Sequence, residues 1–522
     1  MLATAFVQEG RPGRGAGDVE VAAPPGGASR LFTWRNAIGG GVLAFALLGF
    51  VGTGWILLGG GLRPTSIEQS IAVLPFDDLS PEGDQQYFVE GLSEEIINAL
   101  SQIADLKVAA RTSTFLLAEQ GTDIATVAST LGVANVLEGS VRKEGDQIRV
   151  IATLIEAESG FQLWSNTYNR ELTGIFAIQD EIARAITDQL QVTLSGDEQT
   201  ELVAQATEST EAHEAYLRGR YFWNQRTEES LRTAIDEFEK AIILDPEYAE
   251  AYSGLADSYL LVDSYVEALG RLDYRTNLDQ GLIAARRAVS LSPDLGMAHA
   301  SLGFGLWNVG EWESAEREFE RAIQLNQGYA TARYWYGFSL SNTGKALEGV
   351  IHTERAFELD PVSRVNSLIL GISLWLAGRT EEAIEQLRQT TVLAPDWASG
   401  WRELGRTLLE SGEYDGGLEA FVNFARFGDL DVRAAREAYE AAIDYRQTGE
   451  PQTFSDFDLS LLRLIWLYSH TGQPDRAIEL FEGLVEQGAY GPAGRLHGLY
   501  ASDLLGGDPR YQALLEEAGI TW

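Results

Sequence analysis

The sequence contains no cysteine. This absence excludes disulfide bonds, thiolate metal sites and cysteine nucleophiles, and it is compatible with an oxidising or a reducing compartment. Positive charge is also scarce, since 39 Lys and Arg stand against 77 Asp and Glu and leave a formal net charge of −38. So anionic a chain would release few phosphate counterions, and no nucleic-acid partner is expected. The acidity would attract cationic partners, or it is a solvated acidic surface or an adaptation to salt, and the composition leaves these interpretations open.

Motifs for catalysis and for metal or cofactor binding are missing as well. The five histidines lie far apart and form no HExxH pattern, which gives no support for a zinc site. The GK pair at 344–345 is no phosphate-binding loop, because Ser339 takes the place of its first glycine and no Ser or Thr follows the lysine. The adjacent carboxylates at 77–78 and 94–95 could act as acid and base, but such pairs are more often solvated or matched to a helix dipole. We therefore predict a protein that is not an enzyme and has no cofactor and no metal.

One long uncharged stretch lies near the amino terminus, at residues 37–62. At ~1.5 Å per residue it would reach about 39 Å as a helix, which exceeds the ~30 Å hydrocarbon core of a bilayer. Trp34 and Arg35 before it and Arg63 after it are typical interfacial residues. We predict a transmembrane helix over residues 37–62, in preference to a buried soluble helix, which the many glycines would weaken. A cleaved signal peptide is not favoured, because its apolar region usually has only about 7–15 residues.

The charges on either side of this stretch predict its orientation. Four arginines precede it within a Pro-, Gly- and Ala-rich tail, residues 1–36, which we expect to be disordered. Only Arg63 follows it closely, with Glu68 soon after. By the positive-inside rule the tail is cytoplasmic and the rest of the chain lies on the opposite side of the membrane. Gly49 and Thr53 form a small-xxx-small pair that could promote helix dimers, which leaves a homo-oligomer open.

An α/β module is expected over residues 68–195. Short β-type runs alternate there with stretches of helical apolar spacing. The predicted strands are an apolar run from 70 to Pro75, the run 106–111, the two arms of a hairpin within 135–157 and the run 162–170; the predicted helices are 88–103, 123–133 and 175–194. A polar turn at 143–146, which contains Gly145, separates the two arms of the hairpin.

The same stretch resembles a known family. IAVLPFDDLS, EGLSEEI, VAARTS, LGVANVLEGSV and LWSNTYNREL…IFAIQDEIA together, in this order, resemble the TolB amino-terminal-like domain. Bacterial membrane signalling and scaffold proteins often place that domain ahead of tetratricopeptide repeats, so the resemblance implies the bacterial inner membrane, with the bulk of the chain periplasmic. Adenylate-cyclase-like and transcriptional-regulator-like relatives often carry a cyclase or winged-helix domain before the span, for which 36 tail residues leave no room. The resemblance therefore implies architecture and location rather than an output activity.

A strict internal repeat follows the module. Glycines recur at a step of 34 residues, and a second series, mostly proline, follows the same step: Gly303, Gly337, Gly371 and Gly405; Pro293, Gln327, Pro361 and Pro395. Between them lie a small and a large residue of a second helix, at 315 and 319, 383 and 387, and 417 and 421. A 34-residue helix–turn–helix period is the tetratricopeptide (TPR) signature. The small residues are expected to let two helices approach closely while the large ones fill the space beside them, and neighbouring pairs must stack to bury their apolar faces.

Looser units extend the array on both sides. Two precede it, and the second of them carries about 13 extra residues between its helices. A divergent helical stretch and a last pair at 461–488 follow, and residues 508–520 suit a capping helix. We predict TPR repeats over 211–425 and divergent TPR-like repeats with a C-terminal cap over 426–522. The fold class is thus an α/β module followed by an all-α TPR solenoid, preceded by one transmembrane helix.

The concave face of the solenoid is the predicted binding site. By resemblance to the TPR family, positions around each repeat glycine on the first helix of a pair face the groove. The residues mapped in this way are Phe304, Trp307, Asn308, Tyr334, Phe338, Asn342, Trp375, Arg402 and Arg406. Arg402 and Arg406 lie on one helical face and could clasp a peptide carboxylate, while the asparagines would orient a peptide backbone. The alternative is that the aromatics fill the superhelix and the arginines pair with local acids such as Glu403 and Glu410.

The sequence therefore predicts a membrane-anchored periplasmic scaffold that recruits protein or peptide partners through a TPR groove. A second interpretation is a non-catalytic signalling component that relays a periplasmic state through the span to a separate cytoplasmic effector. A third, an enzyme of nucleotide-cyclase type, is disfavoured because no catalytic domain is recognised in the chain.

Overall fold

The computed structural model describes residues 69–519 except 104, 172–174, 191, 193–205, 266–273, 456–460 and 487–501. Residues 67–522 form one compact unit. The predictions for the tail, residues 1–36, and for the transmembrane helix, residues 37–62, lie outside the described residues. Within the described part of the chain, none of the helices combines the length and the apolar character that a membrane crossing requires.

The amino-terminal module is built on a 6-stranded sheet with the order β3–β1–β4–β5–β6, in which β2 also pairs with β4. The strands are β1 (Ser70–Val73), β2 (Asp77–Asp78), β3 (Lys107–Val108), β4 (Asn135–Glu144), β5 (Gln147–Glu156) and β6 (Gln162–Glu171). β1, β2 and β3 make parallel pairings, while β4, β5 and β6 pair antiparallel. The predicted hairpin is confirmed, with Gly145 in the left-handed region at φ 60° between its arms. Residues 77–78, the first of the two adjacent carboxylate pairs, form the short strand β2.

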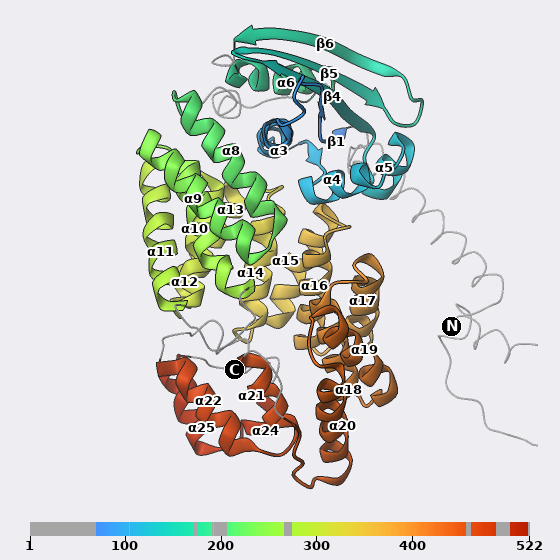
Figure 1. Cartoon of the computed structure of the whole chain (residues 1–522), viewed down its shortest axis with the longest axis vertical. Coiled ribbons are helices and arrows are strands. Elements are labelled where there is room, and N and C mark those ends of the chain that lie inside the picture. Colours follow the sequence, from blue (N-terminus) through green and yellow to red (C-terminus); the bar gives the residue numbers. More distant parts are fainter. Residues whose placement is uncertain are drawn as a thin grey trace, which may run out of the picture. The chain divides into compact units, whose positions relative to one another are not determined.

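Helices cover both faces of this sheet, because successive side chains of a strand point to opposite faces and apolar side chains occur on both. The helices are α3 (Gln86–Ser101), α4 (Arg111–Glu119), α5 (Ile124–Leu131) and α6 (Ile175–Gln189). Leu137 of β4 packs in the same apolar cluster as the buried side chains of α3 and α6, while its neighbour Val136 packs with those of α5. Figure 1 shows α3 and α6 against one side of the long strands. The predicted helices are all present, whereas α4 was not predicted.

An all-α solenoid follows, as the repeat predicts (Figure 1). Its described helices are α8 (Thr210–Gln225), α9 (Glu228–Leu244), α10 (Ala249–Tyr265), α11 (Tyr274–Leu291), α12 (Gly296–Asn308), α13 (Trp312–Leu325), α14 (Ala330–Ser341), α15 (Ala346–Leu359), α16 (Arg364–Leu376), α17 (Thr380–Leu393), α18 (Ala398–Ser411), α19 (Tyr414–Phe427), α20 (Val432–Thr448), α21 (Leu461–His470), α22 (Pro474–Glu486), α24 (Ser502–Leu505) and α25 (Pro509–Glu517). From α8 to α19, consecutive helices pair as antiparallel hairpins that stack on their neighbours.

The close approach of paired helices explains the glycine series. A Cβ atom added at Gly337 would lie 2.7 Å from the carbonyl oxygen of Gly349 on the facing helix. At Gly303 the added atom would lie 3.0 Å from the ring of Phe319, which is the large residue expected to fill this space. A second glycine series with the same 34-residue step (310, 344, 378 and 412) has φ between 75° and 86° and turns the chain between the two helices of a pair.

The carboxyl-terminal helices form a separate apolar cluster with a link back to the repeats. Tyr511 of α25 is fully buried, and its ring centroid lies 4.7 Å from that of Phe481 on α22. Asp508 caps α25 by accepting a hydrogen bond from the amide of Arg510 at 2.9 Å. The indole Nε1 of Trp312, at the start of α13, donates to the carbonyl oxygen of Gly519 at 3.0 Å. The expected C-terminal helix is therefore present and packs against α22.

Candidate functional site

The aromatic residues predicted to line the groove pack mainly against one another. The ring of Phe304 stacks on Trp335 at 4.8 Å and lies 5.9 Å from Trp307, which in turn contacts Phe338 at 5.4 Å. Phe304 and Trp307 are only 8% and 3% exposed. Tyr334 and Phe338 are half-buried. These aromatic rings therefore pack α12 against α14 and occupy the space between the two helices.

The two predicted asparagines hydrogen-bond within their own helices. The side-chain amide of Asn308 donates to the carbonyl oxygen of Phe304 at 2.8 Å, and that of Asn342 donates to Phe338 at 2.7 Å. Asn308 is 6% exposed and Asn342 is fully buried. The Oδ1 atom of Asn342 has no hydrogen-bond partner among the described residues. Both side chains sit at the end of a first helix, and at Asn342 the same carbonyl oxygen of Phe338 also accepts from the backbone amide of Asn342 at 3.1 Å.

The predicted arginine pair is neutralised by local acids. Arg402 and Arg406 each lie 3.0 Å from a carboxylate oxygen of Glu403, and Arg406 is also 3.4 Å from Glu410. Arg406 is 2% exposed and lies over the ring of Trp375 at 5.4 Å. The expectation that these arginines pair with Glu403 and Glu410 is therefore confirmed. Trp375 and Arg402 remain half-buried, and the binding of a peptide at the groove residues stays a prediction.

The α/β module is attached to the first solenoid helix through a buried carboxylate. Glu94 of α3 is 5% exposed. Its Oε1 accepts hydrogen bonds from Nε and Nη2 of Arg220 on α8 at 2.8 and 2.5 Å. Its Oε2 accepts from Asn224 at 2.9 Å and lies 3.0 Å from Nε of Arg111 on α4. One side chain thus ties three helices from two parts of the fold together.

The charge state of Glu94 follows from these partners. Burial acts to raise its pKa, but Arg220 and Arg111 outweigh it, so the pKa of Glu94 is lowered. Burial likewise acts to lower the pKa of Arg220, and Glu94 reverses this effect and raises it. The expectation that the 94–95 pair is solvated or serves a helix dipole is therefore wrong for Glu94, which lies inside α3 and forms a buried ion pair. Neighbouring Glu95 accepts a hydrogen bond from Nε2 of His213 on α8 at 2.7 Å.

A second attachment joins α4 to the loop between α15 and α16. The amide of Ala110 donates to the carbonyl oxygen of Leu359 at 3.2 Å. The hydroxyl of Ser113 donates to Oδ1 of Asp360 at 2.5 Å and accepts from the amide of Val362 at 3.2 Å. Burial raises the pKa of Asp360 to about 6, although these hydrogen bonds oppose the shift. The module therefore contacts the solenoid at two places that are far apart in sequence.

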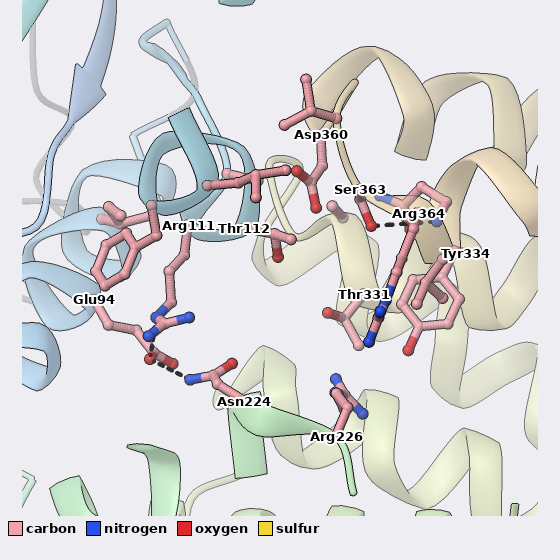
Figure 2. A pocket seen from close by; sticks show the side chains of 18 of the residues that line it. Glu94, Arg111, Thr112, Asn224, Arg226, Thr331, Tyr334, Asp360, Ser363 and Arg364 are labelled. Atoms are coloured by element: carbon pink, nitrogen blue, oxygen red, sulfur yellow. Dashed lines mark hydrogen bonds and ion pairs between the residues drawn. The ribbon is translucent and has the colours of Figure 1, made fainter. Parts of the chain in front are cut away.

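A cleft of about 490 Å³ lies between these two attachments. Figure 2 shows Glu94, Arg111 and Asn224 on one side of it and Asp360, Ser363 and Arg364 on the other. Its walls come from α3, α4, α8 and α14 and from the loops that precede α16 and α18. Tyr334, one of the predicted groove residues, lines this cleft (Figure 2). The volume of this cleft lies within the range of small-molecule sites, about 300–1,000 Å³.

No motif in the sequence indicates most of this cleft. Glu94, Arg220 and Asp360 are brought together by the docking of the module, and no motif spacing connects positions so distant in the chain. Arg226, at a non-glycine position with positive φ, had no detectable signature either. Among the described residues, no cluster of three or more His, Cys, Asp or Glu side chains is arranged to hold a metal ion.

Two family models match parts of the chain. Residues 67–185 match the second domain of the HilA/YgeH-like transcriptional regulators. Residues 369–423 and 425–492 match the tetratricopeptide repeat. The chain therefore contains TPR repeats, preceded by a small sheet-containing module similar to the HilA-like domain.

Known proteins resemble parts of the chain. A protein named "Putative adenylate cyclase 3" from Rhizobium meliloti (strain 1021) is 33% identical over 249 residues, which are 47% of this chain and 42% of that relative. The match thus spans less than half the length of the relative. Among solved structures, YrrB, described as a TPR protein with an unusual peptide-binding site, has 21% identity and a TM-score of 0.27 over 36% of this chain and 91% of its own. PilF of Pseudomonas aeruginosa has 19% identity and a TM-score of 0.31 over 52% of this chain and 98% of its own.

Proposed function

We propose that this protein is a membrane-anchored scaffold that binds protein or peptide partners through its TPR solenoid. The 34-residue repeat, whose glycines let paired helices pack at backbone contact, supports this proposal most strongly. Stacked repeats of this kind present an extended surface for partners. In this molecule we place the contact at the half-buried side chains of the inner helices, namely Tyr334, Phe338, Trp375 and Arg402. The buried residues predicted for the groove would pack beneath these side chains and hold them in position; they are Phe304, Trp307, Asn308, Asn342 and Arg406.

The proposed location is the bacterial inner membrane, with a cytoplasmic amino terminus and a periplasmic bulk. Its support is the uncharged stretch at 37–62 and the excess of arginine before it. The proposal includes the resemblance of residues 68–195 to the TolB amino-terminal-like domain and a single membrane span. Fractionation of cells with and without residues 37–62 tests it. Recovery of the intact chain in the soluble cytoplasmic fraction would contradict the proposal.

Site-specific crosslinking in cells tests the binding surface. A photo-crosslinking amino acid placed at Trp375 or Phe338 should capture a partner, because these side chains are partly exposed on first helices of pairs. The matched control is Ile243 on the second helix α9, which is 80% exposed and lies outside the predicted groove. Capture at the control position but not at the two groove positions would contradict binding through the groove.

A relay between the module and a separate cytoplasmic effector is the second candidate function. The continuous apolar cluster that runs from β1 of the module to α14 of the solenoid favours it, because the two parts would move together. Deletion of residues 1–36 distinguishes the two functions, since a relay requires the tail and a scaffold does not. An unchanged phenotype and partner set after this deletion would exclude the relay. In neither case do we expect nucleotide turnover by the purified chain.

A further inference from the structure

Two arginines that face the cleft form no ion pair with a carboxylate of the described residues. Arg226 and Arg364 both line the cleft, and neither forms an ion pair with a carboxylate in the part of the chain that the structure describes. The other two arginines that line the cleft, Arg111 and Arg220, both pair with Glu94. The charge of Arg226 acts to lower the pKa of the buried Asp257, and Arg364 is exposed, so both guanidinium groups can still turn toward a ligand in the cleft.

Arg226 is held in place by an unfavourable backbone conformation and by an aromatic ring. It ends α8 with φ 56°, in the left-handed region that a residue with a side chain seldom adopts. Its guanidinium lies 3.5 Å from the ring centroid of Trp223, which is 3% exposed. Stacking leaves the N–H groups at the edge of the guanidinium available for a ligand. The indole Nε1 of Trp223, a buried donor, also lacks a hydrogen-bond partner among the described residues.

Arg364 occupies a position where its charge is unfavourable. It is the first residue of α16, whose N-terminus already carries partial positive charge. The Ser363 side chain caps this end by accepting from the amide of Asn366 at 3.3 Å. The guanidinium of Arg364 lies 5.0 Å from the ring centroid of Trp397. A bound anion would reverse the unfavourable interaction between the arginine and the helix end.

The side chains of Arg226 and Arg364 both line the same cleft. Figure 2 shows the side chain of Arg364 extending past Thr331 and Tyr334 toward Arg226. An anion in the cleft would be attracted by both positive charges. The buried acids of the cleft do not supply it, because Glu94 is bound by Arg220 and Arg111, and Asp360 accepts from Ser113. The other two lining carboxylates, of Glu119 and Asp396, are exposed.

We propose that this cleft binds a small organic anion, with a phosphate or carboxylate group held by Arg226 and Arg364. Forked guanidinium groups suit the paired oxygens of both anions. The apolar part of the ligand would lie against Phe115, Trp223 and Tyr334, which line the same cleft. The volume of about 490 Å³ accommodates a small molecule rather than a folded partner. This ligand would bind where the module meets the solenoid, and Tyr334 would belong both to this site and to the proposed partner surface.

Calorimetry and thermal unfolding of the purified full chain test the proposal, with phenyl phosphate and benzoate as probes. At least one of the two should bind and raise the unfolding temperature, and phenol, which lacks the anionic group, should do neither. R226Q and R364Q should each weaken binding by about tenfold or more, because each removes a charge-assisted hydrogen-bonding group. R364K should weaken it less than R364Q, because it keeps the charge but loses the fork.

R355Q is the matched control. Arg355 lies on the surface of α15, where it pairs with Glu358 at 2.7 Å, and its loss should leave probe affinity unchanged. Both cleft variants should fold, since neither arginine forms an ion pair with a carboxylate in the part of the chain that the structure describes, and circular dichroism checks this. Failure of both probes to bind would overturn the proposal, as would equal affinity in the R226Q/R364Q variant. Inorganic phosphate that binds as tightly as phenyl phosphate would overturn the assignment of an organic ligand.

Discussion

Replacement of Glu94 by glutamine should weaken the attachment between the module and the solenoid. Both carboxylate oxygens of Glu94 are engaged, by Arg220 at 2.5 and 2.8 Å, by Asn224 at 2.9 Å and by Arg111 at 3.0 Å. Glutamine has a single acceptor oxygen, and its NH₂ group would face N–H donors of either Arg220 or of Asn224 and Arg111. It also leaves Arg220, which is 8% exposed, without its ion-pair partner. Removal of one partner from a buried ion pair costs about 3–5 kcal/mol, and we expect a loss of this order for E94Q.

Urea unfolding and hydrogen exchange measure this loss. The unfolding midpoint of the purified full chain should fall, and amide exchange should accelerate in α3 and α8, the two helices that Glu94 joins. The control is E144Q, because Glu144 pairs with Arg142 at the surface and the two side chains are 68% and 54% exposed. Such an exposed pair contributes only about 0–1 kcal/mol. A double variant, E94L/R220L, should recover part of the loss, because it leaves no charge unpaired.

The outcome that contradicts this reasoning is specific. If E94Q unfolds at the wild-type urea concentration and exchanges at the wild-type rate in both helices, then Glu94 does not join the module to the solenoid. A lower midpoint with unchanged exchange at α3 and α8 would place the loss elsewhere in the chain and would equally refute the argument.

Three further variants test the packing of helices and the burial of a carboxylate. G337A should destabilise the fold by about 1–3 kcal/mol in urea unfolding, because its Cβ would meet the carbonyl oxygen of Gly349 at 2.7 Å. G483A, at a helical glycine with no atom within 4 Å of the added Cβ, should instead stabilise it by about 0.5–1 kcal/mol. Burial raises the pKa of Asp257 from 3.8 to about 6, so its contribution to stability is complete below pH 3.8 and is lost as the pH rises through 6. D257N should therefore reduce the loss of stability between pH 4 and pH 8 by about 1–3 kcal/mol, whereas D415N on the surface of α19 should not; equal pH profiles for D257N and wild type would contradict the assignment.

The sequence predicted the parts of the fold that depend on local or periodic patterns. The hairpin at 135–157 and the C-terminal helix follow from the spacing of apolar and turn residues within each segment. The repeat follows from the 34-residue period of its glycines and prolines. The helix α4 escaped prediction because its segment, RTSTFLLAE, begins without a side-chain cap and has weak amphipathic character. The turn glycines at 310, 344, 378 and 412 carried a readable period that would have placed the helix ends more accurately.

The candidate site was less accessible to prediction, for a physical reason. Burial of Glu94 and Arg220 results from the docking of α3 on α8, which are separated by more than a hundred residues. The groove positions could be mapped by period, but their exposure could not, since it depends on which aromatics of the next repeat cover them. Trp335, which stacks on Phe304 at 4.8 Å, illustrates this dependence. Arg226 and Arg364 became notable only when the structure showed which arginines have carboxylate partners.

The hydrogen bond from Trp312 to Gly519 has a consequence for how the chain comes apart. In an open array of repeats, each unit touches only its neighbours, so the outermost units can fray one after another. Here Gly519, which follows α25, accepts a hydrogen bond from Trp312 of α13, 207 residues earlier in the chain. At the other end, Ser113 of α4 donates a hydrogen bond to Asp360 in the loop before α16. Neither the C-terminal helices nor the α/β module can separate from the repeats without breaking a contact to the central helices. Unfolding should therefore be more nearly all-or-none than in a simple stack of the same length.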